Sequence, residues 1–218
     1  MFAKFLSISF AIVAQYIEIS PYNINTKEIY EVVNCLKNGG IAIIPTDSIY
    51  AIVGDLHYAS VLQNICKLTN KKPNRVNLSI LCKDLKNLAE YTSQIANPTY
   101  KLMKRLLPGP YTFILNAGGS VPKIFRKSKK TIGIRVPDNS ITQAIIKELG
   151  NPLVSTSIHS SDEIQQYLTE PEEIFEEWNG KVDFIIAGDA GQNIGTTVFD
   201  ATKQEVELTR EGLGIEKL

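Results

Sequence analysis

The chain has 218 residues and equal numbers of acidic and basic side chains, so its formal net charge is zero. A hydrophobic share of 44% is enough for a packed core and excludes a generally disordered protein. This length is most simply one domain, and the scattered cysteines Cys35, Cys66 and Cys82 match no zinc spacing and indicate a reduced, cytoplasmic protein.

The first 14 residues differ in character from the rest of the chain. One lysine followed by an apolar stretch resembles a short secretory signal, and a start codon placed upstream of the true one would give the same pattern. The stretch is shorter than the about 20 residues that a membrane-spanning helix needs. We therefore expect an N-terminal extension over 1–14, a single domain over 15–218 and no contact with a membrane.

Strands and helices alternate along this domain, but not strictly, which predicts an α/β fold with a mixed sheet flanked by helices. The first helix follows Asn25, which stands three residues before Glu28 in a capping-box pattern. The expected strands cover 15–19, 41–44, 78–82, 111–115, 132–136, 153–157, 184–187, 198–200 and 206–208, the last two as a hairpin, and further helices cover 60–68, 85–91, 98–106, 140–149 and 171–178.

Segment 39–50 is the most informative part of the chain. Two glycines end a helix, a continuous apolar strand follows over 41–44, and Pro45 stops it because proline cannot donate to a sheet ladder. The polar residues 46–48 then come just past the carboxyl end of a buried strand. Open α/β sheets bind ligands at such an edge, although an ordinary strand-to-turn junction has the same local pattern.

Basic side chains are concentrated in the middle of the chain. Residues 67–135 hold 15 lysines and arginines against two acids, whereas residues 136–218 hold 16 acids against five cations. This asymmetry indicates a surface that binds a polyanion, or else two solvated surfaces of opposite sign. The run 123–130 has five cations and one aromatic residue, which suits an RNA phosphate backbone. Its candidate RNA-binding residues are Lys123, Arg126, Lys127, Lys129 and Lys130.

Two other basic features point to anionic ligands. The loop 67–75 has four cations and no acid, as a phosphate or carboxylate site would, although a solvated loop is the alternative. Arg135 stands in an apolar strand, where a guanidinium needs an anion or an acidic partner.

Six blocks of sequence occur in the order and spacing of a known family. They are 45–50 (PTDSIY), 107–115, 131–139, 155–157, 196–200 and 210–212. In these blocks the chain resembles the YrdC/YciO family, the threonylcarbamoyl-AMP synthase superfamily, and is nearest to the YciO branch. The resemblance implies a YrdC-like twisted mixed sheet with a basic concave cleft.

Synthases of this family join L-threonine, bicarbonate and ATP into threonylcarbamoyl-AMP, which feeds the modification of an adenosine in tRNA. The resemblance thus implies ATP with Mg²⁺ as a substrate, L-threonine and bicarbonate as further substrates, double-stranded RNA or tRNA as a partner, and neither a tightly bound cofactor nor a protein metal site. It implies catalytic roles for Lys71, Lys72 and Arg135. The implied nucleotide- and substrate-binding residues are Thr46, Ser48, Tyr50, Thr112, Ser155, Ser157, Thr196, Thr197 and Arg210.

The chain departs from the synthase pattern at two places. In this region the synthases have a motif similar to K-x-R-P, and this chain has Asn70 in place of the lysine and Lys72 in place of the arginine, before Pro73. The synthases also have a motif similar to S-x-S-A-N, and this chain has His159 in place of the asparagine. Lysine cannot reproduce the bidentate fork of arginine. Two hypotheses follow: a synthase of weak activity, and a YciO-type RNA-binding module without efficient synthase activity.

Overall fold

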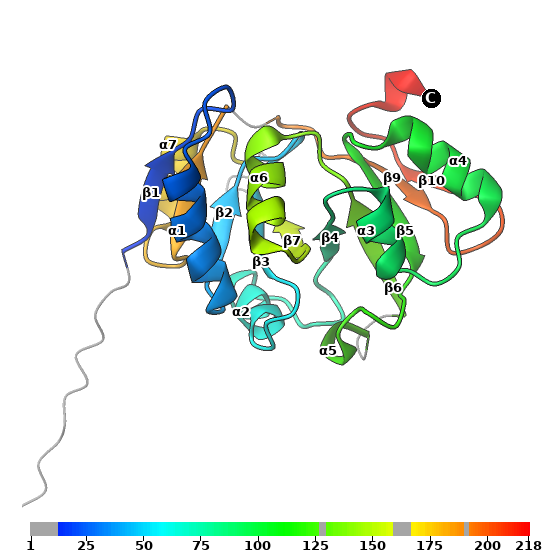
Figure 1. The fold of residues 1–218 in the computed structure, drawn as a ribbon, viewed down its shortest axis with the longest axis horizontal. Helices are drawn as coiled ribbons and strands as arrows, with labels where there is room; N and C mark the ends of the chain where they lie inside the picture. Colours follow the sequence, from blue (N-terminus) through cyan, green and yellow to red (C-terminus); the bar gives the residue numbers. More distant parts are fainter. Residues whose placement is uncertain (1–12, 127–129, 159–166, 190–191) are drawn as a thin grey trace, which may run out of the picture.

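The computed structural model describes residues 13–126, 130–158, 167–189 and 192–218, so most of the expected N-terminal extension lies outside it. Within these residues one ten-stranded sheet has the order β1-β8-β2-β3-β7-β4-β6-β5-β9-β10 and mixes parallel with antiparallel pairs. Helices flank this sheet (Figure 1). The mixed α/β sheet flanked by helices that the sequence predicts is therefore confirmed.

Most expected elements are present within a residue or two of their predicted bounds. Strand β3 and the short helix α5 are not among the elements that the sequence predicts. The strands are β1 (Gln15–Glu18), β2 (Ala42–Ile44), β3 (Ala51–Asp55), β4 (Ser79–Leu81), β5 (Tyr111–Asn116), β6 (Thr131–Arg135), β7 (Leu153–Ser157), β8 (Phe184–Ala187), β9 (Thr197–Asp200) and β10 (Glu207–Arg210). The helices are α1 (Thr26–Lys37), α2 (Val61–Leu68), α3 (Leu85–Glu90), α4 (Asn97–Leu106), α5 (Lys123–Arg126), α6 (Ser140–Leu149), α7 (Pro171–Trp178) and the 3-10 turn η1 (Ile215–Lys217).

Helices α1 and α6 pack side by side over β8, β2 and β3 (Figure 1). The Asn25 side chain caps α1 by accepting a hydrogen bond from the Lys27 backbone N–H, as the capping pattern predicts. Ala51 and Val53 of β3 face these helices, whereas Ile52 between them joins the core on the opposite side. This alternation is the period of two that a strand imposes.

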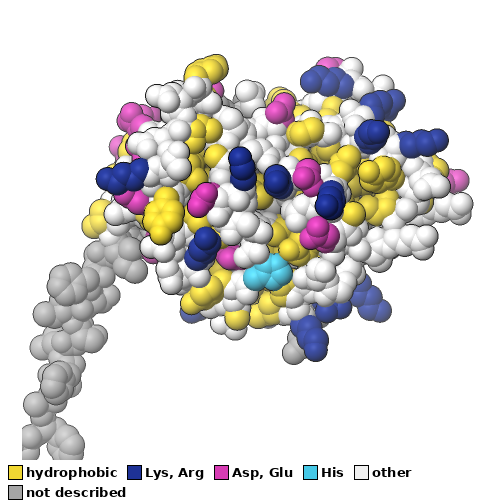
Figure 2. All heavy atoms as spheres, viewed as in Figure 1, with side chains coloured by type: hydrophobic (Ala, Val, Ile, Leu, Met, Phe, Trp, Pro, Cys, Tyr) yellow, Lys and Arg dark blue, Asp and Glu magenta, His cyan; other side chains and the backbone are white. Residues whose placement is uncertain are grey.

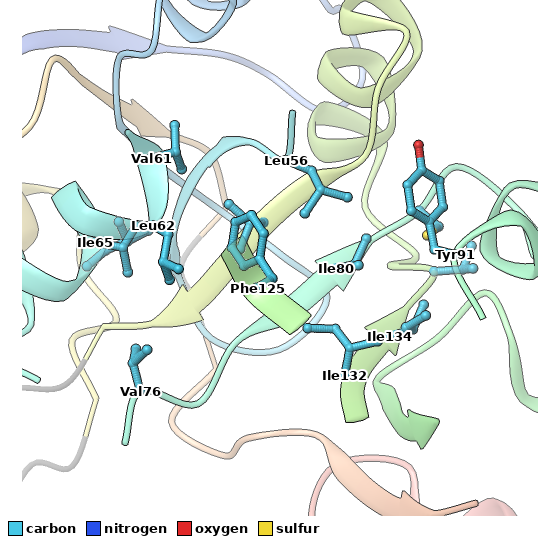
Figure 3. Packing of buried hydrophobic residues seen from close by; sticks show 14 of the residues in the cluster. Leu56, Val61, Leu62, Ile65, Val76, Ile80, Tyr91, Phe125, Ile132 and Ile134 are labelled. Carbon is cyan, nitrogen blue, oxygen red and sulfur yellow. The ribbon is translucent and has the colours of Figure 1, made fainter. Parts of the chain in front are cut away.

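The larger core cluster lies on that opposite side, together with α2, α3, α4 and α7. Figure 3 shows Phe125 of α5 pointing into this cluster beside Leu62 of α2 and close to Ile132 of β6. Phe125 thereby anchors a helix of only four residues. In the part of the chain that the structure describes, no helix has the length and hydrophobicity needed to cross a membrane.

Candidate functional site

A cavity of about 330 Å³ opens on the sheet face that carries α1 and α6, beside these helices, and Ala51 of β3 belongs to its lining. In β5 its walls are alternate residues of the strand: Phe113 points into the core, whereas its neighbours Thr112 and Ile114 line the cavity. The cavity therefore lies over the face of the sheet and not only at strand ends. The lining residues are Ile49, Ala51, Asn77, Leu78, Ser79, Thr112, Ile114, Thr131, Gly133, Arg135, Ser155, Thr156, Ser157, Thr196, Val198 and Arg210.

Arg135 at the end of β6 is the most buried cation of the cavity, with 7% of its surface exposed. Its Nη2 donates to Asp47 Oδ1 at 2.5 Å and to Ser48 Oγ at 3.0 Å. Its Nε is buried and makes no hydrogen bond to any residue that the structure describes. Burial lowers the pKa of Arg135, an effect that the Asp47 carboxylate opposes and the charge of Arg210 reinforces. A buried guanidinium with an unused donor can bind an anionic ligand.

Segment 45–49 is fixed by hydrogen bonds of its own. Thr46 Oγ1 donates to the Ile49 carbonyl at 2.7 Å, accepts from the Ser48 backbone N–H at 3.1 Å and lies 3.2 Å from Ser48 Oγ. From the side of α6, Thr142 Oγ1 donates to the Pro45 carbonyl at 2.6 Å. The segment is thus held at both ends beside Arg135.

Thr112, Thr196 and Arg210 form a second polar group at the cavity. The two threonine hydroxyls lie 2.8 Å apart, and the Arg210 guanidinium donates to the Thr196 carbonyl from Nε at 3.1 Å and from Nη2 at 2.9 Å. Arg210 is exposed, unlike Arg135. The cavity thus has one buried and one exposed arginine, and none of its described lining residues is acidic.

The floor of the cavity contains a glycine in the middle of a strand. A Cβ atom built on Gly133 would lie 2.9 Å from Ser79 Oγ and 3.2 Å from Thr112 Cγ2. Ser79 pairs with Gly133 in the β4–β6 ladder, and its carbonyl accepts a hydrogen bond from Ser155 Oγ at 3.2 Å. A glycine inside a strand is typical of a place where another group approaches the backbone closely.

The structure brings together six of the residues predicted to bind or act on substrates. Two others, Thr46 and Ser48, lie behind Arg135 and are not part of the lining. The exposed Lys71 and Lys72 do not line the cavity either; the lining begins a few residues later, at Asn77. The six predicted residues that line it are Thr112, Arg135, Ser155, Ser157, Thr196 and Arg210.

Thr197 and Tyr50 are fully buried and face other parts of the chain. Thr197 Oγ1 donates to the Leu213 carbonyl at 2.8 Å and accepts from the Gly212 N–H at 3.1 Å, which ties the C-terminal segment to β9. The Tyr50 hydroxyl donates to the Asp189 carbonyl at 3.3 Å and accepts from the Gly188 N–H at 3.2 Å. Burial raises the pKa of Tyr50 to about 12.

The predicted RNA-binding residues lie partly outside the described chain. Lys127 and Lys129 fall there, as does His159 at the second departure from the synthase pattern. Lys123 and Lys130 are exposed, whereas Arg126 is half-buried and donates to the Val121 carbonyl at 2.9 Å. In Figure 2 acids and cations intermingle over the middle of the visible face, and only cations are seen at the lower end, where Figure 1 places α5.

The sequence analysis missed several parts of this site. In the sequence Asp47 is only one of three polar residues after a strand, although the expected need of Arg135 for an acidic partner is a signal that points to it. Ser79 and Gly133 had no such signal, because only the pairing of β4 with β6 brings them together. Among the described residues, no group of three or more His, Cys, Asp or Glu side chains could hold a metal ion.

Known proteins resemble this chain over nearly its whole length. The family model Sua5_yciO_yrdC, described as telomere recombination, matches residues 34–212. The chain is similar to YciO of Escherichia coli, with 36% identity over 92% of this chain and 97% of that protein. A Methanocaldococcus jannaschii protein provisionally named a threonylcarbamoyl-AMP synthase is 31% identical over 92% of this chain and 95% of its own length.

Solved structures share the fold. The crystal structure of E. coli YciO matches with a TM-score of 0.85 at 35% identity, over 94% of this chain and 98% of that one. The structure of P. abyssi Sua5 complexed with L-threonine matches with a TM-score of 0.83 at 22% identity, over 91% of this chain and 58% of the Sua5 chain. The second likeness concerns the fold alone.

Proposed function

Since this chain belongs to the Sua5/YciO/YrdC family, we propose that it is a cytoplasmic enzyme that makes threonylcarbamoyl-AMP from ATP, L-threonine and bicarbonate. The observation that carries the proposal is the cavity lined by Arg135, Arg210 and a set of serine and threonine hydroxyls. The name of the M. jannaschii relative supports the same reaction, and P. abyssi Sua5 shows that a protein of this fold binds L-threonine.

The proposed reaction needs positioning more than acid–base groups. Bicarbonate loses hydroxide and becomes carbon dioxide. The uncharged threonine amine forms a bond to the carbon of carbon dioxide, and the proton that the amine loses combines with the hydroxide as water, which leaves a carbamate. A carbamate oxygen then forms a bond to the α-phosphorus of ATP, the bond from that phosphorus to the bridging oxygen breaks, and pyrophosphate leaves with the bonding electrons. Arg135 and Arg210 would neutralise the anionic groups of the substrates, and the hydroxyls would orient them.

Magnesium would enter this site together with ATP. Mg²⁺ prefers oxygen ligands and keeps several waters, and it is commonly bound through substrate phosphates. Because no carboxylate is among the described lining residues, the triphosphate and water would supply its ligands. The cavity volume of about 330 Å³ is near the lower end of the roughly 300–1,000 Å³ typical of small-molecule sites. It would enclose the reacting groups and leave part of the nucleotide outside.

The proposal is tested by incubating the protein with MgATP, L-threonine and bicarbonate and measuring pyrophosphate release. We expect release that requires all three substrates and that falls at least tenfold in Arg135→Ala. Asp55→Asn is the control, since Asp55 is also a buried charged residue but is not among the residues that line the cavity. The proposal fails if the wild-type protein releases no pyrophosphate above the level without threonine.

A second candidate function is binding of double-stranded RNA or tRNA, with or without catalysis. Its support is the proximity of two basic segments: Pro73 of the basic loop 67–75, and Val76 just after that loop, line a small apolar pocket with Phe125 of α5. The exposed cations around this pocket are Lys71, Lys72, Arg75, Lys123 and Lys130.

A further inference from the structure

We infer that Thr46, Asp47 and Ser48 act as one positioning unit for Arg135 and do not bind substrate themselves. The inference rests on the proposed function, because it assigns to these residues the task of presenting one guanidinium to an anionic substrate. None of the three lines the cavity, whereas Arg135 does. The Asp47 and Arg135 side chains are 7% and 8% exposed, so the ion pair is nearly out of contact with water.

The hydrogen atoms of this unit can each be assigned. The single hydroxyl hydrogen of Thr46 is donated to the Ile49 carbonyl, so in the contact between Thr46 and Ser48 the donor is Ser48. Ser48 Oγ is thereby turned so that its lone pairs accept from Arg135 Nη2. Thr46 therefore acts on the arginine only through Ser48.

Asp47 accepts hydrogen bonds with both carboxylate oxygens. Oδ1 accepts from Arg135, and Oδ2 accepts from the Asp138 backbone N–H at 3.0 Å, where the chain passes from β6 to α6. An asparagine has the same shape but only one acceptor oxygen, so its NH₂ group would face either the guanidinium or the Asp138 N–H. Asp47→Asn must therefore lose one of the two contacts.

All these bonds to Arg135 reach a single nitrogen, Nη2. The Nε group is left buried and unpaired among the described residues, next to the cavity. The unit thus fixes the guanidinium by one corner and leaves donors for a ligand. Leaving a buried donor unsatisfied is costly, which favours the binding of an acceptor there.

The experiment is a double-mutant cycle measured by calorimetric titration with MgATP and, separately, with L-threonine. We expect Asp47→Asn to weaken, at least tenfold, the binding of the same ligand that loses affinity in Arg135→Ala. In the Arg135→Ala background, Asp47→Asn should have no further effect. Ser48→Ala should have the same effect to a smaller degree. The matched control is Asp55→Asn, because Asp55 is also buried and also accepts hydrogen bonds, from the His57 N–H and the Asn151 amide.

A second measurement needs no ligand. In ¹⁵N NMR spectra of the arginine side chains, the guanidinium of Arg135 should rotate slowly in the wild type and in Asp55→Asn, and fast in Asp47→Asn. The inference is overturned if Asp47→Asn leaves this rotation slow. It is also overturned if Asp47→Asn weakens ligand binding as much in the Arg135→Ala background as in the wild-type background. Failure of wild type to bind either ligand would instead count against the proposed function, and the NMR result would still decide the role of Asp47.

Discussion

At the scale of single residues, Arg135 should contribute more to nucleotide binding than any other described side chain of the cavity. A charge-assisted hydrogen bond is worth about 1.5–3 kcal/mol, and we expect Arg135→Ala to weaken ATP binding by this amount. Arg210→Ala should weaken it less, because Arg210 is exposed and its contacts with a ligand are screened by water. Titration calorimetry with MgATP measures both, and unchanged affinity in both variants would contradict the assignment.

Gly133 should control the space in the cavity. In Gly133→Ala the new methyl group would displace the Ser79 hydroxyl, which lies 2.9 Å from the added Cβ position. Because a serine side chain can rotate away, we expect a loss of unfolding free energy of about 1 kcal/mol, at the low end for overpacking. Ligand affinity should fall at least tenfold, since the same methyl group enters the cavity.

The matched control for this variant is Gly119→Ala, where an added Cβ would meet no atom within 4 Å. Urea unfolding gives the change in stability, and titration with ATP and L-threonine gives the change in affinity. If Gly133→Ala loses as much free energy of unfolding as free energy of ligand binding, the substitution acts through the fold and not through the cavity.

At the scale of elements, the sequence predicted most strands and helices because each carries its own signal. The helix after Asn25 has a cap and an apolar stripe, and the strand before Pro45 is continuously apolar. β3 had no separate signal: it begins at Ala51, shortly after the polar residues 46–48, and contains Gly54. It forms because β2 pairs with it on one side and β7 on the other.

The candidate site was predicted only in part for a similar reason. The period of two placed Ser155 and Ser157 on one side of a strand, and both line the cavity. The position just past the carboxyl end of a strand predicted that Thr46 and Ser48 line the cavity as well, and the family resemblance implied the same for Thr197. In the structure their hydroxyls bond to the chain itself, and only tertiary pairing determines this.

Activity should be improvable at the two departures from the synthase pattern, in the loop after α2 and at His159. We expect Lys72→Arg combined with His159→Asn to raise pyrophosphate release, because both changes restore the pattern of the synthases. Asn70→Lys should help less, since Asn70 has a φ of 50°, a conformation in which a lysine is strained. No gain in release from a folded Lys72→Arg/His159→Asn variant would mean that these departures do not limit activity.

At the scale of the whole molecule, the basic segments predict salt-dependent RNA binding. Each neutralised phosphate releases condensed counterions, so log affinity should fall with log salt by about 0.7 per contact for single strands and about 0.9 for duplex. Replacing Lys71, Lys72, Lys123 and Lys130 with glutamine should flatten this slope. We expect little sequence preference, because duplex RNA is recognised mainly through its shape and backbone.

Filter binding over a series of salt concentrations measures the slope for wild type and for this fourfold variant. Replacing Lys101, Lys104, Arg105 and Lys147 with glutamine, on α4 and α6, is the control of equal charge change. An unchanged slope in the fourfold variant, or no retention of RNA at low salt, would show that these segments are merely solvated.

The walls of the cavity come from strands that the ribosome makes at widely separated times. β3 forms one wall and β9 another, and β9 reaches its place by pairing with β5 across the sheet. A nascent chain that already contains Arg135 would still lack Thr196, Val198 and Arg210, and so could not enclose a substrate. The cavity is therefore completed only after β9 and β10 have been synthesised, and a chain that stops before Thr196 should bind ATP and L-threonine more weakly than the full chain.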